Sequence, residues 1–289
     1  MTTALYDLPG PRARQRHRLY GVGSTVVILA LIGWIIYLLL VSGQFAAAKW
    51  TPFTYKGIQE LLLRGLGNTL KAFGLAAVLS LALGGVLATG RLSEHRALRW
   101  VCTLLVEFFR AMPVLVMIFF IYVALKAEPL VALVAGLTLY NGSVLAEVFR
   151  TGVNSVDRGQ REAAYALGMG KTQVMTHVLV PQAVRAMLPA IISQLVVALK
   201  DTSLGFLITY EEFLHAGKLI ASNLDYDLPF IPVVMIISPI YIGMCMLLSW
   251  LAYWVSKRQR RNPKVEAVEV AAPEPGTLLP GGGGHKPPA

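Results

Sequence analysis

The chain has 289 residues, of which 55% are hydrophobic and only 15% charged. Soluble domains carry about 25% charged residues, so this composition excludes an ordinary water-soluble domain and favours a protein whose surface faces lipid. The formal net charge of +10 does not indicate nucleic-acid binding, because the basic residues flank apolar stretches, as expected beside anionic inner-leaflet lipid.

Four stretches without a charged side chain are long enough to cross a bilayer as helices. They hold 30, 19, 18 and 29 residues, and they follow Arg18, Lys71, Glu128 and Asp227; a spanning helix needs about 20. Two shorter uncharged stretches, 111–125 and 186–199, reach that length if each includes a flanking charged group. The sequence therefore predicts an all-α integral membrane protein with six spans, at about 22–41, 66–89, 101–125, 130–149, 187–208 and 231–255.

The first span is interpreted as a permanent helix, the alternative being a cleaved signal peptide. Its apolar run from Val22 to Val41 exceeds the core of about 7–15 residues that a signal peptide has. The following Gln44–Ala48 is a weak cleavage site. We therefore expect an accessory transmembrane helix with an external loop over 21–59.

The distribution of Lys and Arg predicts the orientation. Six spans place both ends of the chain on one side, where 18 of the 26 basic residues lie; six lie on the other side and two within spans. By the positive-inside rule, the basic tail 1–20, the loop at 90–100 and the segment 150–186 are expected in the cytoplasm. So is the tail 257–289, whose Pro- and Gly-rich composition predicts disorder.

The segment 150–186 carries the most informative polar pattern. Residues 160–167 are mostly good helix formers, and Gly168 stands where a left-handed glycine ends a helix. A second helical run, from Thr172 to Val180, is expected to stop at Pro181. This pattern predicts a helix–turn–helix on the inner membrane surface, although an ordinary amphipathic connector would give a similar one.

The first helix of this segment has a small apolar face made of Ala163, Ala164 and Leu167. We expect that face to dock into a partner protein. The tripeptide Gly170-Lys171-Thr172 resembles the end of a phosphate-binding loop, but such a loop needs a glycine where this chain has Tyr165. No ATP site, nucleophile–base pair or metal-spaced cluster stands out, so we expect no catalytic residue, no metal site and no cofactor in this chain.

The spacing of this segment resembles the coupling loop of permease subunits of bacterial ABC importers. Their pattern is E-A-A, three residues, G, nine residues, then I-x-L-P. Here Glu162-Ala163-Ala164 is followed at those spacings by Gly168 and by Val178-Leu179-Val180-Pro181. The departures are Val178 for Ile and Val180 for Leu.

Other motifs resemble the polar amino-acid branch of that family, the histidine, glutamine and glutamate permeases. Phe109–Pro113 is similar to F-R-G-T-P with Ala111 and Met112 as departures, and Asn68-Thr69, Ala146–Arg150 and Lys200–Leu204 are similar to further family motifs. The resemblance covers about 60–256, the family's five-helix core, and leaves span one and both tails outside. The N-terminal Leu5–Arg12 resembles the start of a permease of actinobacterial glutamate importers.

The resemblance implies a transport subunit rather than an enzyme, located in the cell membrane. It would work with two cytoplasmic ATPases that hold ATP and Mg²⁺, a second permease, identical or homologous, and an extracytoplasmic amino-acid-binding protein. The residues expected to contact the ATPase are Glu162, Ala163, Ala164, Gly168 and Pro181. Glutamate is the substrate that the resemblance favours, with histidine, arginine and glutamine as alternatives for the same scaffold. The alternatives are a stand-alone secondary transporter or channel, and a membrane-anchored regulatory protein.

Charged residues inside the spans are the remaining candidates. Glu107 with Arg110, and Glu147 with Arg150, have the same three-residue spacing, which puts each pair on one helix face. The two pairs fall at similar depth and could meet. Because an intramembrane charge costs about 2.5–3.5 kcal/mol or more unless paired or hydrated, these groups are expected to line the substrate path or to form a structural cluster. Lys200-Asp201, near the outer end of span five, is interpreted either as a hydrated helix end near the external gate or as a pair near the substrate path.

Overall fold

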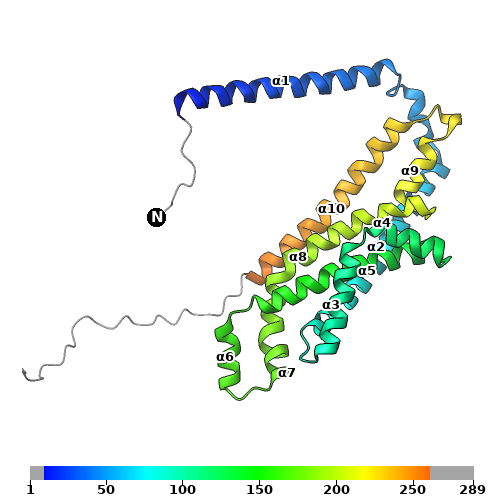
Figure 1. Cartoon of the computed structure of the whole chain (residues 1–289). Coiled ribbons are helices and arrows are strands. Elements are labelled where there is room, and N and C mark those ends of the chain that lie inside the picture. The colour runs from blue at the N-terminus through cyan, green and yellow to red at the C-terminus, as the bar shows by residue number, and fades with distance from the viewer. Residues whose placement is uncertain (1–9, 261–289) are drawn as a thin grey trace, which may run out of the picture.

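The computed structural model describes residues 10–260, and these form a helical bundle from which the first helix extends (Figure 1). The α-helices are α1 (Pro11–Val41), α2 (Lys56–Arg91), α3 (Arg96–Ala111), α4 (Val114–Phe119), α5 (Pro129–Asn154), α6 (Arg158–Ala166), α7 (Lys171–Gln173), α8 (Val180–Asp201), α9 (Phe213–Ala221) and α10 (Phe230–Arg260). Short segments join them: η1 (Ala47–Lys49), η2 (Thr51–Thr54), η3 (Phe120–Ala124), η4 (Val174–Leu179), η5 (Thr202–Ile208) and η6 (Leu224–Tyr226). We call the end of the bundle that carries α6 and α7 the loop end.

The centre of the bundle is the parallel pair α2 and α5. Their contacts advance together along both helices, since Ala72 and Ala76 cluster with Leu133 and Leu137, and Arg91 at the end of α2 reaches Glu147. The helices approach closely at Gly84, where an added Cβ would lie 2.9 Å from Leu145 Cβ. Small residues give such close packing in membranes, where lipid removes the hydrophobic drive between helices.

The expected third span is not one straight helix. It consists of α3 and of α4 with the π-helical segment η3, and the two parts meet at an angle of 100°. The break falls at Met112 and Pro113, because proline offers no N–H and its ring holds the preceding residue in extended conformation, with ψ of 134° at Met112. The span expected over 101–125 is therefore a broken one.

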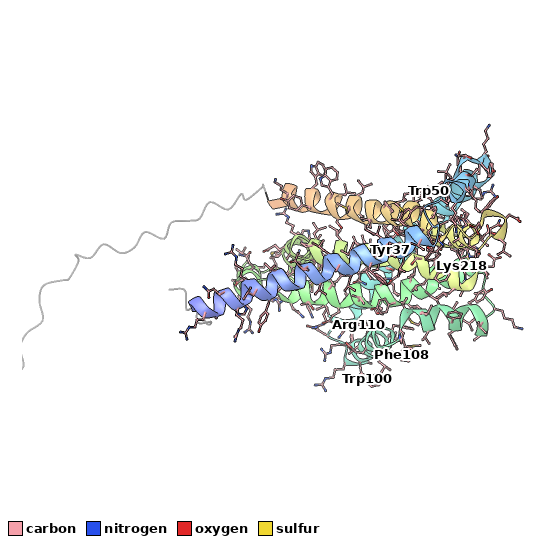
Figure 2. All side chains as sticks on the ribbon, turned by 90° about the horizontal axis from the view of Figure 1, so that it is seen from above. Tyr37, Trp50, Trp100, Phe108, Arg110 and Lys218 are labelled. Atoms are coloured by element: carbon pink, nitrogen blue, oxygen red, sulfur yellow. The ribbon has the colours of Figure 1, made fainter. Side chains whose placement is uncertain are left out.

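The bent pair α3–α4 nevertheless crosses the bundle. Because α2 and α5 are parallel and both end at the loop end, the chain between them has to return to the opposite end. Five unbroken helices of the described part are long and apolar enough to span a membrane, and the bent pair adds a sixth span. Trp100 and Phe108 of α3 lie at the edge of the bundle (Figure 2), with side chains 68% and 55% exposed.

Helix α8 runs antiparallel to α5 and completes the centre of the bundle. Gln194 of α8 donates a hydrogen bond of 2.7 Å to Asn141 Oδ1 of α5, whose amide donates to the Leu137 carbonyl at 2.8 Å. The expected stop at Pro181 was wrong. The π-helical segment η4 leads directly into α8, so the helical path continues past Pro181 in the first turn of α8.

The stretch after α8 holds a helix that the sequence did not predict, α9, and a buried acid fixes its start. The fully buried Glu212 accepts hydrogen bonds from the N–H groups of Leu214 and His215 and from the Tyr241 hydroxyl of α10. Thr69 of α2 accepts from the Phe213 N–H at 3.0 Å. Asn68-Thr69, singled out in the sequence as a motif, therefore anchors α9 to α2.

Helix α1 differs from the other long helices, because none of its described side chains is buried and it extends away from the bundle (Figure 1). It begins at Pro11, so the second half of the expected basic tail 1–20 is helical. At the other terminus α10 continues to Arg260, slightly past the expected start of the tail at 257. The predicted disorder of 261–289 lies outside the described residues.

Candidate functional site: the coupling loop and the charge network beside it

The segment 150–186, called the coupling loop here because of its resemblance to that of ABC importer permeases, projects from the loop end as α6, a turn and α7 (Figure 1). Asp157 caps α6 by accepting a hydrogen bond of 2.7 Å from the Gly159 N–H, which is the role of a short acidic side chain at a helix start. Glu162 and Ala163 on α6 are exposed. The loop therefore offers a carboxylate and a small side chain to the exterior of the molecule.

The face of α6 that points inward contains Ala164. Its side chain is 4% exposed and packs in a cluster with Val153, Val174 and Leu179. The prediction that Ala163, Ala164 and Leu167 form one docking face was wrong for Ala164, because the small side chain is used to bring α6 against η4. The apolar groups left outside are Tyr165, 46% exposed, and Leu167, 82% exposed.

Gly168 ends α6 as the sequence predicted. Its φ is +78°, in the left-handed region that side chains with a Cβ resist. Its N–H donates to the Tyr165 carbonyl at 2.9 Å, and the Met169 N–H donates to the Ala164 carbonyl at 3.2 Å. This pair of bonds is a Schellman motif, and it fixes the turn that presents Leu167.

The turn between α2 and α3 contacts the coupling loop. Leu92 packs against the cluster that holds Ala164, and Glu94 forms an ion pair with Lys171 of α7. The hydrogen bond from Lys171, with its positive charge, lowers the pKa of the fully exposed Glu94 carboxyl. Lys171 is therefore an ion-pair partner, and not part of a phosphate-binding loop.

Next to this turn lies a network of five charged side chains from three helices. Arg91 of α2 contacts Glu107 Oε1 of α3 at 3.2 Å and Glu147 Oε2 of α5 at 2.8 Å. Arg150 grips both oxygens of Glu147, at 2.6 and 3.0 Å, and Arg110 lies 3.7 Å from Glu107. The structure thus brings together the two pairs that the sequence placed at similar depth.

Sequence reasoning missed Arg91, the group that joins the two pairs. Its side chain is 9% exposed, whereas those of Glu107 and Glu147 are 55% and 24% exposed. Arg91 was assigned to the loop after span two, because it directly follows an uncharged stretch. One signal could have pointed to Arg91: it lies at the same end of the predicted bundle as Glu107 and Glu147. Whether Arg91 reaches these two carboxylates, however, depends on how α2 packs against α3 and α5.

Glu147 also borders a cavity of about 310 Å³ between α5 and α8, together with Thr151, Met187 and Ala190. By contrast, Lys200 and Asp201 lie at the far end of α8, away from the loop end. The six charged residues that the sequence proposed for a substrate path therefore occupy two ends of the bundle.

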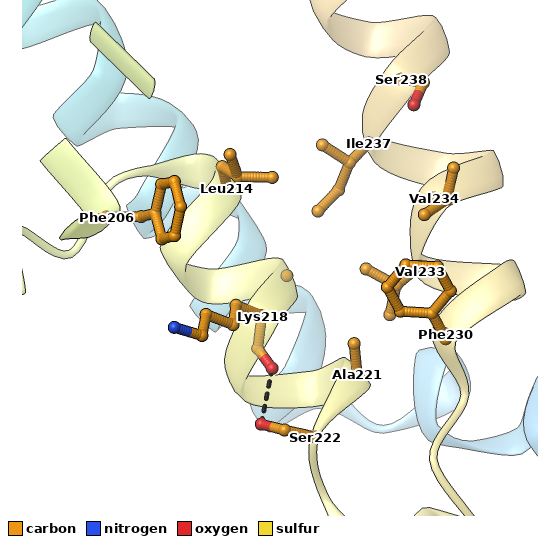
Figure 3. A pocket seen from close by; sticks show the side chains of 11 residues that line it. Phe206, Leu214, Lys218, Ala221, Ser222, Phe230, Val233, Val234, Ile237 and Ser238 are labelled. Carbon is orange, nitrogen blue, oxygen red and sulfur yellow. Dashed lines mark hydrogen bonds between the residues drawn. The ribbon is translucent and has the colours of Figure 1, made fainter. Parts of the chain in front are cut away.

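A second cavity, of about 360 Å³, lies between α9 and α10 (Figure 3). Its lining is apolar, with Phe206, Leu214, Phe230, Val233 and Ile237 around the gap. Lys218 points away from α10 (Figure 3), and its Nζ lies 5.2 Å from the centroid of the Phe206 ring. Three polar residues, Lys218, Ser222 and Ser238, also belong to this mostly apolar lining. Among the described residues no cluster of His, Cys, Asp or Glu could hold a metal.

The fold and this site define a class: a multi-pass helical membrane protein with an exposed helical loop built against its transmembrane core. The family described as "binding-protein-dependent transport system inner membrane component" matches residues 80–261. The chain therefore belongs to this family of inner membrane components, and the resemblance found in its motifs is confirmed.

Individual relatives place the chain among the amino-acid permeases of ABC importers. The glutamate transport system permease protein GluD of Corynebacterium glutamicum is 40% identical over 243 residues, which cover 81% of this chain and 88% of that protein. A probable glutamine ABC transporter permease protein, GlnP of Bacillus subtilis, is 33% identical over 196 residues, which cover 66% of this chain and 90% of that protein.

A solved structure supports the same assignment. The crystal structure of an amino acid ABC transporter with histidines contains a chain that is 29% identical, with a TM-score of 0.65, and covers 69% of this chain and 94% of its own. As a permease subunit, the protein has no ATPase activity itself. The predicted all-α, multi-pass membrane fold is confirmed as well.

Proposed function

We propose that this permease subunit imports glutamate, and that its coupling loop docks into a cytoplasmic ATPase. The observation that carries the docking is the geometry of the loop: an exposed Leu167 at 82%, held out by the left-handed Gly168 at φ +78°. Leu167 and the half-exposed Tyr165 are the large apolar side chains that α6 and its turn leave outside, and in this proposal the ATPase covers them. The relative named as a glutamate permease, 40% identical, supports the substrate.

The proposed assembly has two permeases, this chain with an identical or homologous one, two ATPases that bind ATP and Mg²⁺, and an extracytoplasmic binding protein. The excess of basic residues on the loop side supports an orientation with both termini in the cytoplasm. In this proposal residues 60–256 are the transport core, 21–59 an accessory helix with its external loop, and 1–20 and 257–289 cytoplasmic tails.

Uptake by the assembled transporter tests this function. In proteoliposomes that contain this chain, its ATPase and its binding protein, labelled glutamate should accumulate only when ATP and Mg²⁺ are supplied. Unlabelled glutamate should compete about tenfold better than histidine or arginine, a difference of about 1.4 kcal/mol in binding. Accumulation by this chain alone, without ATPase, would contradict the proposal and indicate a stand-alone transporter.

We further propose that the charged side chains near the loop end border the path of the substrate. The cavity of about 310 Å³ beside Glu147 supports this role, since its carboxylate is close to a space that a small solute would fill. Glu147 would meet the ammonium of the substrate, and Arg110, 36% exposed, its carboxylate. Glu107 and Arg150 would hold these two groups, and Lys200 with Asp201 would serve the outer end of the path.

The variants Arg110→Gln and Glu147→Gln test the path. If their charges contact the substrate, each should lower glutamate uptake about tenfold or more while the complex with the ATPase still forms. Gln removes the charge in both variants; it matches Glu in size and is shorter than Arg, so formation of the complex with the ATPase checks that each variant is folded. The matched control is Arg99→Gln, an exposed charge on the same helix α3. Normal uptake by both variants would assign the charges a structural role only.

A further inference from the structure

We propose that the end of α2, residues Arg91–Glu94, transmits movement of the coupling loop to the transmembrane helices, with Arg91 as its positioning residue. This inference rests on the proposed docking of the loop to an ATPase. Three contacts carry it: the ion pairs of Arg91 with two helices, the packing of Leu92, and the pairing of Glu94 with Lys171.

Arg91 is the residue through which the charge network joins different helices. Glu107 and Arg110 both belong to α3, and Glu147 and Arg150 both belong to α5. Arg91, by contrast, reaches from α2 to both carboxylates, at 3.2 and 2.8 Å. Without Arg91 each carboxylate would keep its own arginine three residues away, so both charges would stay paired, while the ion pairs that join α2 to α3 and to α5 would be lost.

The position of Arg91 gives this link its strength. Its side chain is 9% exposed and that of Glu147 is 24% exposed, so this ion pair is less screened than a surface pair, whereas Glu107 is 55% exposed. A guanidinium presents several N–H groups in a fixed plane and can serve two carboxylates at once, whereas the ammonium of lysine is a point charge. Arg91 Nη1 lies 2.8 Å from Glu147 Oε2, but its N–H groups do not point at that oxygen, so the contact is an ion pair without a hydrogen bond.

The other side of the same turn touches the coupling loop. Leu92 follows Arg91 directly and packs against the buried cluster of that loop, to which Ala164, Val174 and Leu179 belong. The helix does not fray here, because the Leu92 N–H donates to the Ala88 carbonyl at 3.0 Å and the Ser93 N–H to that of Gly90 at 3.2 Å. A displacement of α6 therefore presses on a continuous helix end that holds Arg91.

Helix α3 is placed to respond to such a displacement. It is separated from α4 by the break at Met112 and Pro113, with an angle of 100° between the two helices. Its outer face, with Trp100 and Phe108 exposed, lies at the edge of the bundle (Figure 2). Arg91 grips α3 at Glu107, one turn before this break, so it can shift α3 without moving α4 by the same amount.

The variant Arg91→Gln separates coupling from assembly. The complex with the ATPase should form, ATP hydrolysis should stay within about twofold of the parent, and the amount of glutamate imported per ATP should fall about tenfold with an unchanged KM for glutamate. Arg91→Lys should restore this ratio only in part. Arg96→Gln, an exposed arginine five residues further on, is the matched control and should leave the ratio unchanged.

Two other results would contradict the inference. If Arg91→Gln lowers ATP hydrolysis and uptake in the same proportion, Arg91 only supports the fold. If that variant does not assemble, Glu107→Gln decides, since it releases α3 from Arg91 at a half-exposed site; an unchanged import per ATP would then overturn the inference. Failure of the parent protein to bind an ATPase would instead reject the proposed function.

Discussion

Replacing Gly168 by valine should abolish stable association of this permease with its ATPase. The residue has φ of +78°, and a left-handed backbone costs a residue with a Cβ about 1–2 kcal/mol, more when the side chain is β-branched. A cost of this size reduces the correctly folded turn about 5- to 30-fold. The Schellman bonds of Gly168 and Met169 would break, and Leu167 would lose its fixed position.

The chain offers a matched control two residues away. Gly170 has φ of −68° and ψ of 157°, a conformation that valine adopts without strain, and its added Cβ would make only an ordinary contact of 3.6 Å with Gln173. Co-purification of tagged ATPase with Gly168→Val and with Gly170→Val measures the difference. Equal recovery of the ATPase with both variants would show that the conformation of the turn is not what the partner binds.

Replacing Gly84 by valine should prevent accumulation of the folded permease. An added Cβ at this position would lie 2.9 Å from Leu145 Cβ and 3.1 Å from the Gly142 carbonyl oxygen, so α2 and α5 would have to separate. Overpacking of this kind costs about 1–3 kcal/mol, and here it falls on the helix pair that forms the centre of the bundle.

The adjacent Gly85 is the control, because an added Cβ there meets nothing within 4 Å. Gly85→Val should change stability by about 0.5 kcal/mol or less. The yield of monodisperse protein in detergent and its midpoint of thermal unfolding measure both variants. A Gly84→Val protein as stable as Gly85→Val would show that the close approach of α2 and α5 does not determine stability.

The number and place of the spans could be predicted because the bilayer imposes a length on uncharged stretches. Their ends could not, since a helix continues into the polar region once its hydrogen bonds are formed: α2 covers Lys56–Arg91 where 66–89 was expected. The break at Pro113 had a local signal in the proline itself. Its angle of 100° depends on the packing of α3 against α2 and α5, which no local pattern contains.

In the candidate site, too, some features could be predicted from the sequence and others could not. Gly168 could be predicted because a left-handed turn after a helix has a local cause. The inward position of Ala164 and the bridge through Arg91 could not, because both depend on residues distant in sequence, Val174 and Leu179 in one case and Glu107 and Glu147 in the other. The buried Glu212 was missed for the same reason, since its partner Tyr241 is 29 residues away.

Photo-crosslinking from position 167 tests the docking of the coupling loop most directly. The side chain of Leu167 is 82% exposed at the tip of the loop, so a photoreactive amino acid can replace it without disturbing the core. In cells that express the whole transporter, irradiation should yield one product whose mass is that of this chain plus the ATPase. A product with the extracytoplasmic binding protein, or none from a variant that still transports, would contradict the docking of this loop on the ATPase.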